Sequence, residues 1–188
     1  VYYEFGNVVD RDFEKSFAAY QKAASSGVVR AMHKLGEFYQ NGKGVTQDVV
    51  AAKAWYEAAS NANFAPSQVA LGSIYEYGVG VRQNATAAAN QYVLAADQGN
   101  ALAMLRLASM YERGAATPKG EPDLVRAWTY AKMAVDASNS QPQAVQFFEA
   151  LEKAMKKEQI DEATKIYEQK KASMAKEQKP EGDKPAAQ

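Results

Sequence analysis

Side chains that could do acid–base, nucleophilic or metal chemistry are scarce in this sequence of 188 residues. It contains no cysteine and a single histidine, His33, so disulfides, thiolate zinc sites, cysteine nucleophiles and sites with two imidazoles are excluded. Catalysis by His33 would need an oriented acid or nucleophile beside it, and the sequence identifies none. We therefore expect no catalytic residue, metal or cofactor, and expect His33 to face a groove or solvent, with a partner contact as the alternative.

Two Gly-x-Gly steps, Gly42-Lys43-Gly44 and Gly78-Val79-Gly80, invite comparison with a phosphate-binding loop. Such a loop needs a preceding strand, a longer glycine spacing and a Lys-Ser/Thr pair at the start of a helix. The sequence has none of these features around either step. The two steps lie at the same place in a repeat, so a repeated turn explains them.

The overall charge and hydropathy exclude further classes of protein. Lys and Arg total 22 and Asp and Glu total 22, and a net charge of zero argues against a strong binder of nucleic acid or acidic lipid. No apolar run approaches the roughly 18 residues that a membrane-spanning helix needs. We expect the tyrosines and tryptophans at repeat positions to lie mostly in the core. An aromatic cage that binds a ligand is the alternative.

The sequence repeats with a period of 36 residues, which indicates an array of structural repeats. At this shift a leucine, a tyrosine and a glycine recur in three successive copies: Leu35, Leu71 and Leu107; Tyr39, Tyr75 and Tyr111; Gly42, Gly78 and Gly114. After Gly114 the register slips by three residues within 115–122, a segment rich in Gly, Pro and Thr where a loop insertion costs little.

Each repeat predicts two helices joined by the glycine turn. Apolar residues at helical spacing, such as Ala31 and Leu35, indicate the first helix, which ends at Gly42, a residue suited to the positive φ of a helix C-cap. Asp48 is a typical N-cap for the second helix, and Asn84 holds the same place in the next repeat. Small residues recur where two helices must approach closely, so stacked repeats should interdigitate into a continuous core.

The motif L-G-x-x-Y-x-x-G-x-G-V-x-x-D followed by A-x-x-W-Y-x-x-A-A resembles the Sel1-like repeat, a relative of the tetratricopeptide repeat. One copy is complete: Leu35-Gly36, Tyr39, Gly42, Gly44-Val45, Asp48, Ala52, Trp55-Tyr56 and Ala58-Ala59. The next copy has Gln91 in place of the tryptophan, and the third has Ala116 in place of the second loop glycine. The resemblance covers roughly residues 2–137. It implies an all-α, right-handed α-solenoid of antiparallel helix pairs that acts as a scaffold or adaptor, often in bacterial envelope, secretion or signalling systems.

We predict three segments along the chain. Residues 1–137 should form about four Sel1-like repeats, the first of them truncated, with sequence missing upstream because Tyr3 already matches the tyrosine of a first helix. Residues 138–175 should form a divergent pair of helices, over 142–156 and 159–175, whose Lys- and Glu-rich outer positions suit a terminal cap. Residues 176–188 are polar, contain two prolines and should be disordered.

In tetratricopeptide-like solenoids the first helix of each pair usually lines the concave side, so its positions away from the Leu-Gly-Tyr stripe are candidates for partner binding. These are Arg30, His33, Glu37, Gln40, Val69, Ser73, Glu76, Leu105, Ser109 and Glu112. One slot holds Glu4, Gln40, Glu76 and Glu112, and a carboxylate row there would suit a basic or amide-rich partner segment. The alternative is that this slot only stabilises the turn beneath it.

These observations predict a non-catalytic scaffold or adaptor that binds a protein or peptide through the concave groove of a helical repeat array. The alternatives are a self-assembling module and a small-ligand-binding, receptor-type module of a bacterial envelope system. We expect no nucleic-acid partner, no direct membrane insertion, and a monomer or a weakly self-associating protein. The bacterial periplasm or the extracellular space is the expected location, with the cytoplasm as the alternative.

Overall fold

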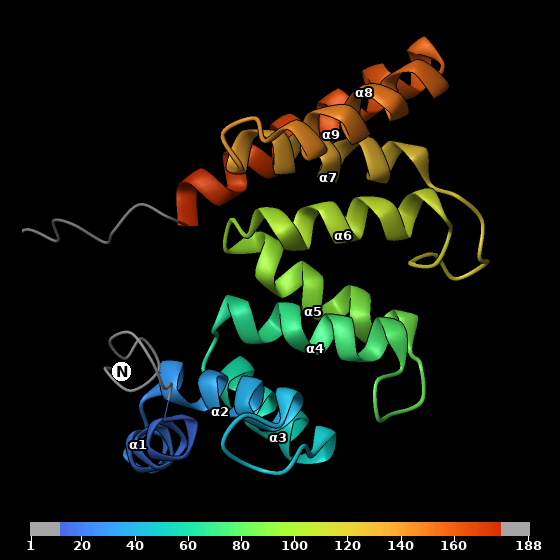
Figure 1. Ribbon diagram of the computed structural model, residues 1–188. Helices are drawn as coiled ribbons and strands as arrows, with labels where there is room; N and C mark the ends of the chain where they lie inside the picture. Colours follow the sequence, from blue (N-terminus) through green and yellow to red (C-terminus); the bar gives the residue numbers. More distant parts are fainter. Residues whose placement is uncertain (1–11, 178–188) are drawn as a thin grey trace, which may run out of the picture. The chain divides into compact units, whose positions relative to one another are not determined.

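The structure is a computed structural model that describes residues 12–177. Within this range the chain forms nine α-helices in successive antiparallel pairs (Figure 1). Their bounds are α1 Phe13–Ser25, α2 Val29–Asn41, α3 Val49–Asn61, α4 Ala65–Tyr77, α5 Ala85–Asp97, α6 Ala101–Glu112, α7 Leu124–Ala137, α8 Pro142–Ala154 and α9 Lys157–Glu177. The all-α architecture of antiparallel helix pairs predicted from the repeat is confirmed. No helix in this part of the chain is long and apolar enough to cross a membrane.

The helices fall into two compact units, residues up to Ala95 and residues from Ala96 onward. In the first unit α2 packs between α1 and α3, and α3 also packs against α4. In the second unit α7 packs against α6, α8 and α9. Each unit therefore places first and second helices of the repeat in direct contact, as a stacked repeat requires.

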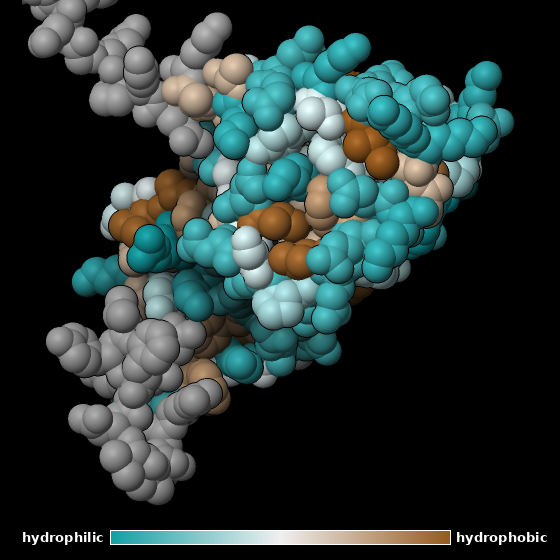
Figure 2. All heavy atoms as spheres, turned by 90° about the horizontal axis from the view of Figure 1, so that it is seen from above, coloured by the Kyte–Doolittle hydropathy of each residue, from teal (hydrophilic) through white to brown (hydrophobic). Residues whose placement is uncertain are grey.

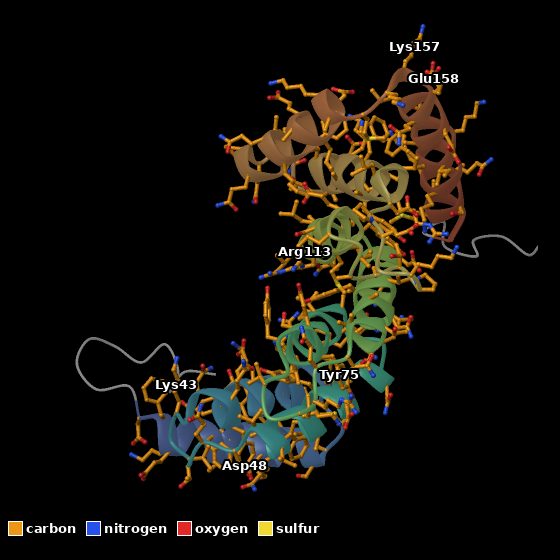
Figure 3. The ribbon with its side chains drawn as sticks, turned by 90° about the vertical axis from the view of Figure 1, so that its right-hand side faces the viewer. Lys43, Asp48, Tyr75, Arg113, Lys157 and Glu158 are labelled. Atoms are coloured by element: carbon orange, nitrogen blue, oxygen red, sulfur yellow. The ribbon has the colours of Figure 1, made fainter. Side chains whose placement is uncertain are left out.

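The turn between the two helices of a repeat has the chemistry that the sequence predicts. Gly42 caps the end of α2 with φ of 64°, a left-handed conformation that glycine adopts without a steric penalty. Asp48 caps the start of α3 by accepting a hydrogen bond from the backbone N–H of Ala51 at 3.0 Å. Lys43 and Asp48 both lie in this connection (Figure 3). Asn84 caps α5 in the same way, at 2.9 Å.

A glycine on the first helix faces a tyrosine on the second helix in two successive pairs. Gly36 lies against the ring of Tyr56, and Gly72 lies against the ring of Tyr92. A Cβ atom added to either glycine would lie 2.4 Å from the nearest ring carbon. Both tyrosines are buried. The small residue at this position is therefore what allows the tyrosine to enter the core between the helices.

The third complete pair replaces this contact with a different solution. Ala108 stands at the glycine position and Ala131 stands where the tyrosine would be, and both are fully buried. The neighbouring aromatic residues, Tyr111 and Tyr130, stack nearly parallel with their ring centroids 5.8 Å apart. Compared with the two preceding pairs, the first helix has a larger residue here and the second helix a smaller one. The two changes together keep the core filled.

The C-terminal pair forms close to the predicted places. α8 ends at Ala154, and α9 continues to Glu177, two residues past the predicted end of this pair. Lys157 and Glu158 mark the first turn of α9 and point away from the helices (Figure 3). On the face of the molecule that Figure 2 shows, hydrophilic side chains cover most of the surface and apolar ones form small patches. The capping role of this pair stays a prediction. Glu4 and the tail after 177 lie outside the described residues.

Candidate partner-binding surface

The first helices of the pairs carry the residues predicted to bind a partner. These helices are α2 and α4 in the first unit and α6 in the second. Among the predicted residues Arg30 is exposed, Glu76 is buried and the rest are half-buried: His33, Glu37, Gln40, Val69, Ser73, Leu105, Ser109 and Glu112. The candidate surface is therefore less open than the sequence predicts, and its members differ in what they contact.

Glu76 is buried and does not present an exposed carboxylate, so this part of the prediction is wrong. Only 6% of Glu76 is exposed. Its Oε2 accepts a hydrogen bond from the hydroxyl of Tyr92 at 2.8 Å, and the Ser73 hydroxyl lies 3.1 Å from the same tyrosine oxygen. The backbone carbonyl of Glu76 accepts a further hydrogen bond from the Gln83 amide at 2.7 Å. The side chain serves the packing of α4 against α5.

Gln40 fills the same slot one repeat earlier and makes the same contacts. Its Oε1 accepts a hydrogen bond from the Tyr56 hydroxyl at 2.8 Å, and its carbonyl accepts one from the Gln47 amide at 2.8 Å. A glutamine and a glutamate therefore act alike here, as acceptors for the buried tyrosine of the second helix. These contacts favour the alternative interpretation, in which the slot stabilises the turn and the helix pair, over a carboxylate row that recognises a partner.

His33 is largely covered and not open to solvent. Its side chain is 14% exposed, and Nδ1 lies 2.9 Å from the hydroxyl of Ser67 on α4. The ring also packs against the rings of Tyr56 on α3 and Phe64 just before α4, with centroid separations of 5.4 Å in both cases. A solvent-facing position is thus wrong, because α3 and the start of α4 close over the ring, while a position in a groove stays a prediction.

Glu37 and Arg30 form the exposed, charged part of α2. The carboxylate of Glu37 lies 3.6 Å from Nε2 of His33 and 2.8 Å from Nζ of Lys34, and its side chain is 40% exposed. The hydrogen bond with His33 is the largest cause that lowers the pKa of Glu37. Together with the interaction with Lys34, it lowers this pKa to about 2. Glu37 is therefore ionised at neutral pH, in a local arrangement of mixed charge.

The second unit contains a hollow between α6 and α8, which we call the α6/α8 hollow. Its volume is about 340 Å³, and it is lined by Leu102, Leu105, Arg106 and Ser109 from α6 and by Gln143 and Phe147 from α8. The spacings of three and four place the α6 residues on one face of that helix. Leu102 is 51% exposed. The hollow thus combines an apolar lining with polar groups that can fix the orientation of an occupant.

The structure brings two of the predicted residues, Leu105 and Ser109, into this hollow. Glu112 does not line it, although it lies on the same helix. Leu102 was not among the predicted residues. It occupies the repeat slot of Arg30 and Pro66, so its apolar side chain departs from the preceding repeats and was a usable signal.

Three further lining residues were not predicted either: Arg106, Gln143 and Phe147. Arg106 shares the α6 face with Leu102 and could have been found from helical spacing. Gln143 and Phe147 had no such signal, because the α8 sequence does not align with the repeat.

The charged and polar side chains near the candidate surface show what it can offer a ligand. In the part of the chain that the structure describes, no three histidine, cysteine or acidic side chains gather as ligands for a metal ion. The α6/α8 hollow holds one cation, two neutral polar side chains and three apolar ones. An apolar lining with a few polar groups is typical of small ligand-binding hollows in proteins.

Antiparallel helix pairs that recur every 36 residues define an α-helical repeat protein of the tetratricopeptide-related class. The sequence model of the Sel1 repeat matches four successive segments, residues 1–28, 29–64, 65–100 and 101–139. The chain therefore belongs to the Sel1 repeat family. Arrays of such repeats generally mediate protein interactions and are typically non-catalytic.

Two solved structures illustrate the likeness. A Sel1 repeat protein from Oxalobacter formigenes is 27% identical, with a TM-score of 0.71 over 78% of this chain and 58% of its own. A protective antigen of uropathogenic Escherichia coli with an SLR fold is 17% identical and shares the fold, with a TM-score of 0.57 over 100% of this chain and 64% of its own. The chain thus spans less than two thirds of either protein. A comparison with curated proteins finds no match.

Proposed function

We propose that the chain is a non-catalytic scaffold or adaptor that binds a protein or peptide partner on the first helices of its repeats. The observation that carries this proposal is the α6/α8 hollow of about 340 Å³, with the half-exposed Leu102 at its edge. Rigid helices present this surface already formed. Little conformational entropy is therefore lost in ordering the site when a partner binds. In the first unit, taken by itself, Arg30 and Val69 are the proposed contacts.

The lining of the hollow indicates what kind of segment it suits. Leu102, Leu105 and Phe147 favour an apolar side chain, and an anchor of this kind typically dominates the binding energy. Arg106 favours an acidic or amide group beside that side chain, while Ser109 and Gln143 can form hydrogen bonds with the partner's backbone. The proposed partner segment is therefore apolar with an acidic neighbour, and not the basic segment that an exposed carboxylate row would have suited.

Site-specific photo-crosslinking in the native host tests the location of the surface. The crosslinking amino acid p-benzoylphenylalanine replaces Leu102 in one variant and Leu94 in a matched control. Leu94 is a leucine of similar exposure, 46% against 51%, but it lies on α5, a second helix of its pair. We expect a crosslinked protein from position 102 and none from position 94. Equal crosslinking from both positions would contradict the proposal.

Titration with the partner so identified measures the contribution of the hollow. Leu102→Asp should weaken binding about tenfold, as the loss of an apolar anchor does. Leu94→Asp, with the same change of charge and size, should leave the affinity within twofold. A circular-dichroism melt of each variant verifies that both are folded. An unchanged affinity for Leu102→Asp would exclude the hollow as the binding site.

Self-association and location are separate parts of the proposal. We propose a monomer or a weakly self-associating protein, which light scattering at several concentrations tests. A crosslink from position 102 that joins two copies of the chain would support the self-assembling alternative instead.

Localisation in the periplasm or outside the cell of a bacterial host is likewise proposed, and fractionation of that host tests it.

A further inference from the structure

A second hollow in the same unit lies on the opposite side of α6 from the α6/α8 hollow. It has a volume of about 390 Å³ and lies among α6, α7 and α9, so we call it the methionine hollow. Its apolar lining includes Met104 from α6, Met133 from α7 and Met174 from α9. Met104 and Met133 are buried, at 1% and 5% exposure, and Met174 is half-buried near the end of α9. Nothing in the proposed partner surface uses these residues.

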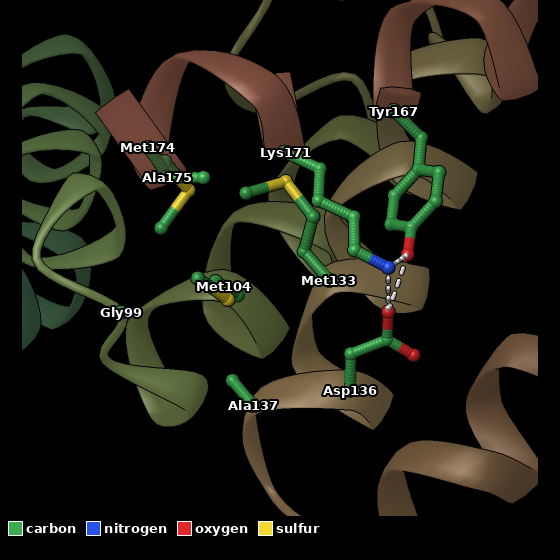
Figure 4. A pocket seen from close by; sticks show the side chains of 9 residues that line it. All are labelled: Gly99, Met104, Met133, Asp136, Ala137, Tyr167, Lys171, Met174 and Ala175. Carbon is green, nitrogen blue, oxygen red and sulfur yellow. Dashed lines mark hydrogen bonds and ion pairs between the residues drawn. The ribbon is translucent and has the colours of Figure 1, made fainter. Parts of the chain in front are cut away.

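Three polar side chains lie together at one side of this hollow, while Met104 and Met174 lie apart from them (Figure 4). The Tyr167 hydroxyl donates a hydrogen bond to Oδ2 of Asp136. The ammonium group of Lys171 donates to the Tyr167 oxygen at 2.9 Å and lies 3.7 Å from the same carboxylate oxygen.

One cation and one anion, Lys171 and Asp136, line the hollow. The Asp136 carboxylate also pairs with Lys132 at 3.3 Å, and Glu168 acts electrostatically on Lys171. The side chain of Lys171 is 61% exposed, and an ammonium group has three N–H donors. Lys171 thus places N–H donors at one exposed edge of an apolar hollow.

We infer that the methionine hollow binds a small amphipathic carboxylate, with its unbranched alkyl chain against Met104, Met133 and Met174 and its carboxylate at Lys171. The volume falls within the range of small-ligand sites in proteins. Methionine side chains are unbranched and flexible, so they adapt to a linear chain of methylenes better than a rigid aromatic lining would. The exposed ammonium group of Lys171 supplies the complement for one anionic group.

The ionisation of the polar trio is compatible with this role. Burial opposes the ionisation of Asp136, but its hydrogen bonds with Tyr167 and Lys132 outweigh burial and hold its pKa below the ordinary value. The hydrogen bond to Tyr167 raises the pKa of Lys171. Lys171 is therefore a cation at neutral pH. Burial and the hydrogen bond to Asp136 also raise the pKa of Tyr167, so its hydroxyl stays a donor.

The six methionines of the chain provide the readout for a test with the whole 188-residue chain. Octanoate is titrated into protein labelled with ¹³C at the methionine methyl groups, and each methyl resonance is followed by NMR. We expect saturable shifts of the three methyls in the hollow and none of the three elsewhere, at Met32, Met110 and Met155. Shifts of all six, or of none, would overturn the proposal.

Two control compounds separate the two halves of the ligand. Octanol keeps the alkyl chain without the carboxylate, and acetate keeps the carboxylate without the chain. We expect both to bind more weakly than octanoate. A short peptide ending in leucine that shifts the three methyls more strongly than octanoate would show that the hollow binds a peptide terminus, and would overturn the assignment to a linear alkyl carboxylate.

Two pairs of variants test the residues. Lys171→Met should weaken octanoate binding about two- to fivefold, as expected for one partly exposed charge contact, and should leave octanol unaffected. Lys165→Met, which removes an exposed lysine elsewhere on α9, is its control. Met174→Glu should abolish octanoate binding because it places a like charge in the hollow, and Ser173→Glu, at the exposed neighbouring position, should not. Octanoate affinity unchanged by both Lys171→Met and Met174→Glu in folded protein would refute the site.

Discussion

Replacing Gly72 by alanine tests the glycine–tyrosine contact that recurs in two helix pairs. The added Cβ would lie 2.4 Å, 2.6 Å and 2.8 Å from three carbons of the Tyr92 ring, all well inside van der Waals contact. The ring is completely buried, and its hydroxyl donates to Glu76 at 2.8 Å. It therefore cannot move aside without losing packing and this hydrogen bond.

The size of the effect follows from three contributions. Overpacking of a core costs about 1–3 kcal/mol, and a weakened hydrogen bond to a charged group adds about 1.5 kcal/mol. Alanine is the better helix former by about 1 kcal/mol, which offsets part of this loss. We expect Gly72→Ala to lower the free energy of unfolding by about 2–3 kcal/mol, or the melting temperature by roughly 5–10 °C.

A double-mutant cycle separates this steric cause from a general intolerance of the site. Tyr92→Ala alone should be costly because it leaves a cavity. In that background Gly72→Ala should be neutral or stabilising by up to about 1 kcal/mol, because the clash is gone and only the helix propensity remains. Urea denaturation followed by circular dichroism measures each corner. The reasoning is refuted if Gly72→Ala costs the same with and without the Tyr92 ring. The natural pair Ala108 and Ala131 shows the combination that the cycle creates.

Three further predictions concern the same unit. Leu71→Ala should destabilise by about 2–5 kcal/mol, since Leu71 is 1% exposed, and an unchanged melting temperature would mean that the core face is misassigned. Glu76→Gln should cost little, because glutamine accepts the tyrosine hydrogen bond in the preceding repeat. Glu76→Ala should cost about 1–3 kcal/mol, because it removes the carboxylate that accepts the buried hydrogen bond of Tyr92. Equal melting temperatures for the two variants would contradict this. Glu37 has a folded-state pKa of about 2 against an ordinary 4.5, so its stabilising contribution is present above about pH 4.5 and is lost as the pH falls toward 2. Denaturation midpoints between these pH values should therefore fall more steeply for the wild type than for Glu37→Gln, and parallel curves would exclude the effect.

The sequence by itself determined the repeat and the local structure of each pair. The 36-residue period indicated that each repeat contains two helices. Glycine, aspartate and asparagine at the turns specified where these helices end and begin, because positive φ and N-capping are local requirements. Leu35 and Leu71 were identified as core residues because helical spacing fixes which face of a helix is apolar.

Only the tertiary structure decided which side chains at the edge of that face are covered. Glu76 and His33 looked accessible from spacing along their own helices, but Tyr92 and Ser67 reach them from neighbouring helices. The same holds for the two hollows, which need α8 or α9 to supply a wall, and the matched Sel1 repeats end before these two helices. Periodicity describes one helix at a time, whereas burial and cavities depend on the length and direction of side chains from several.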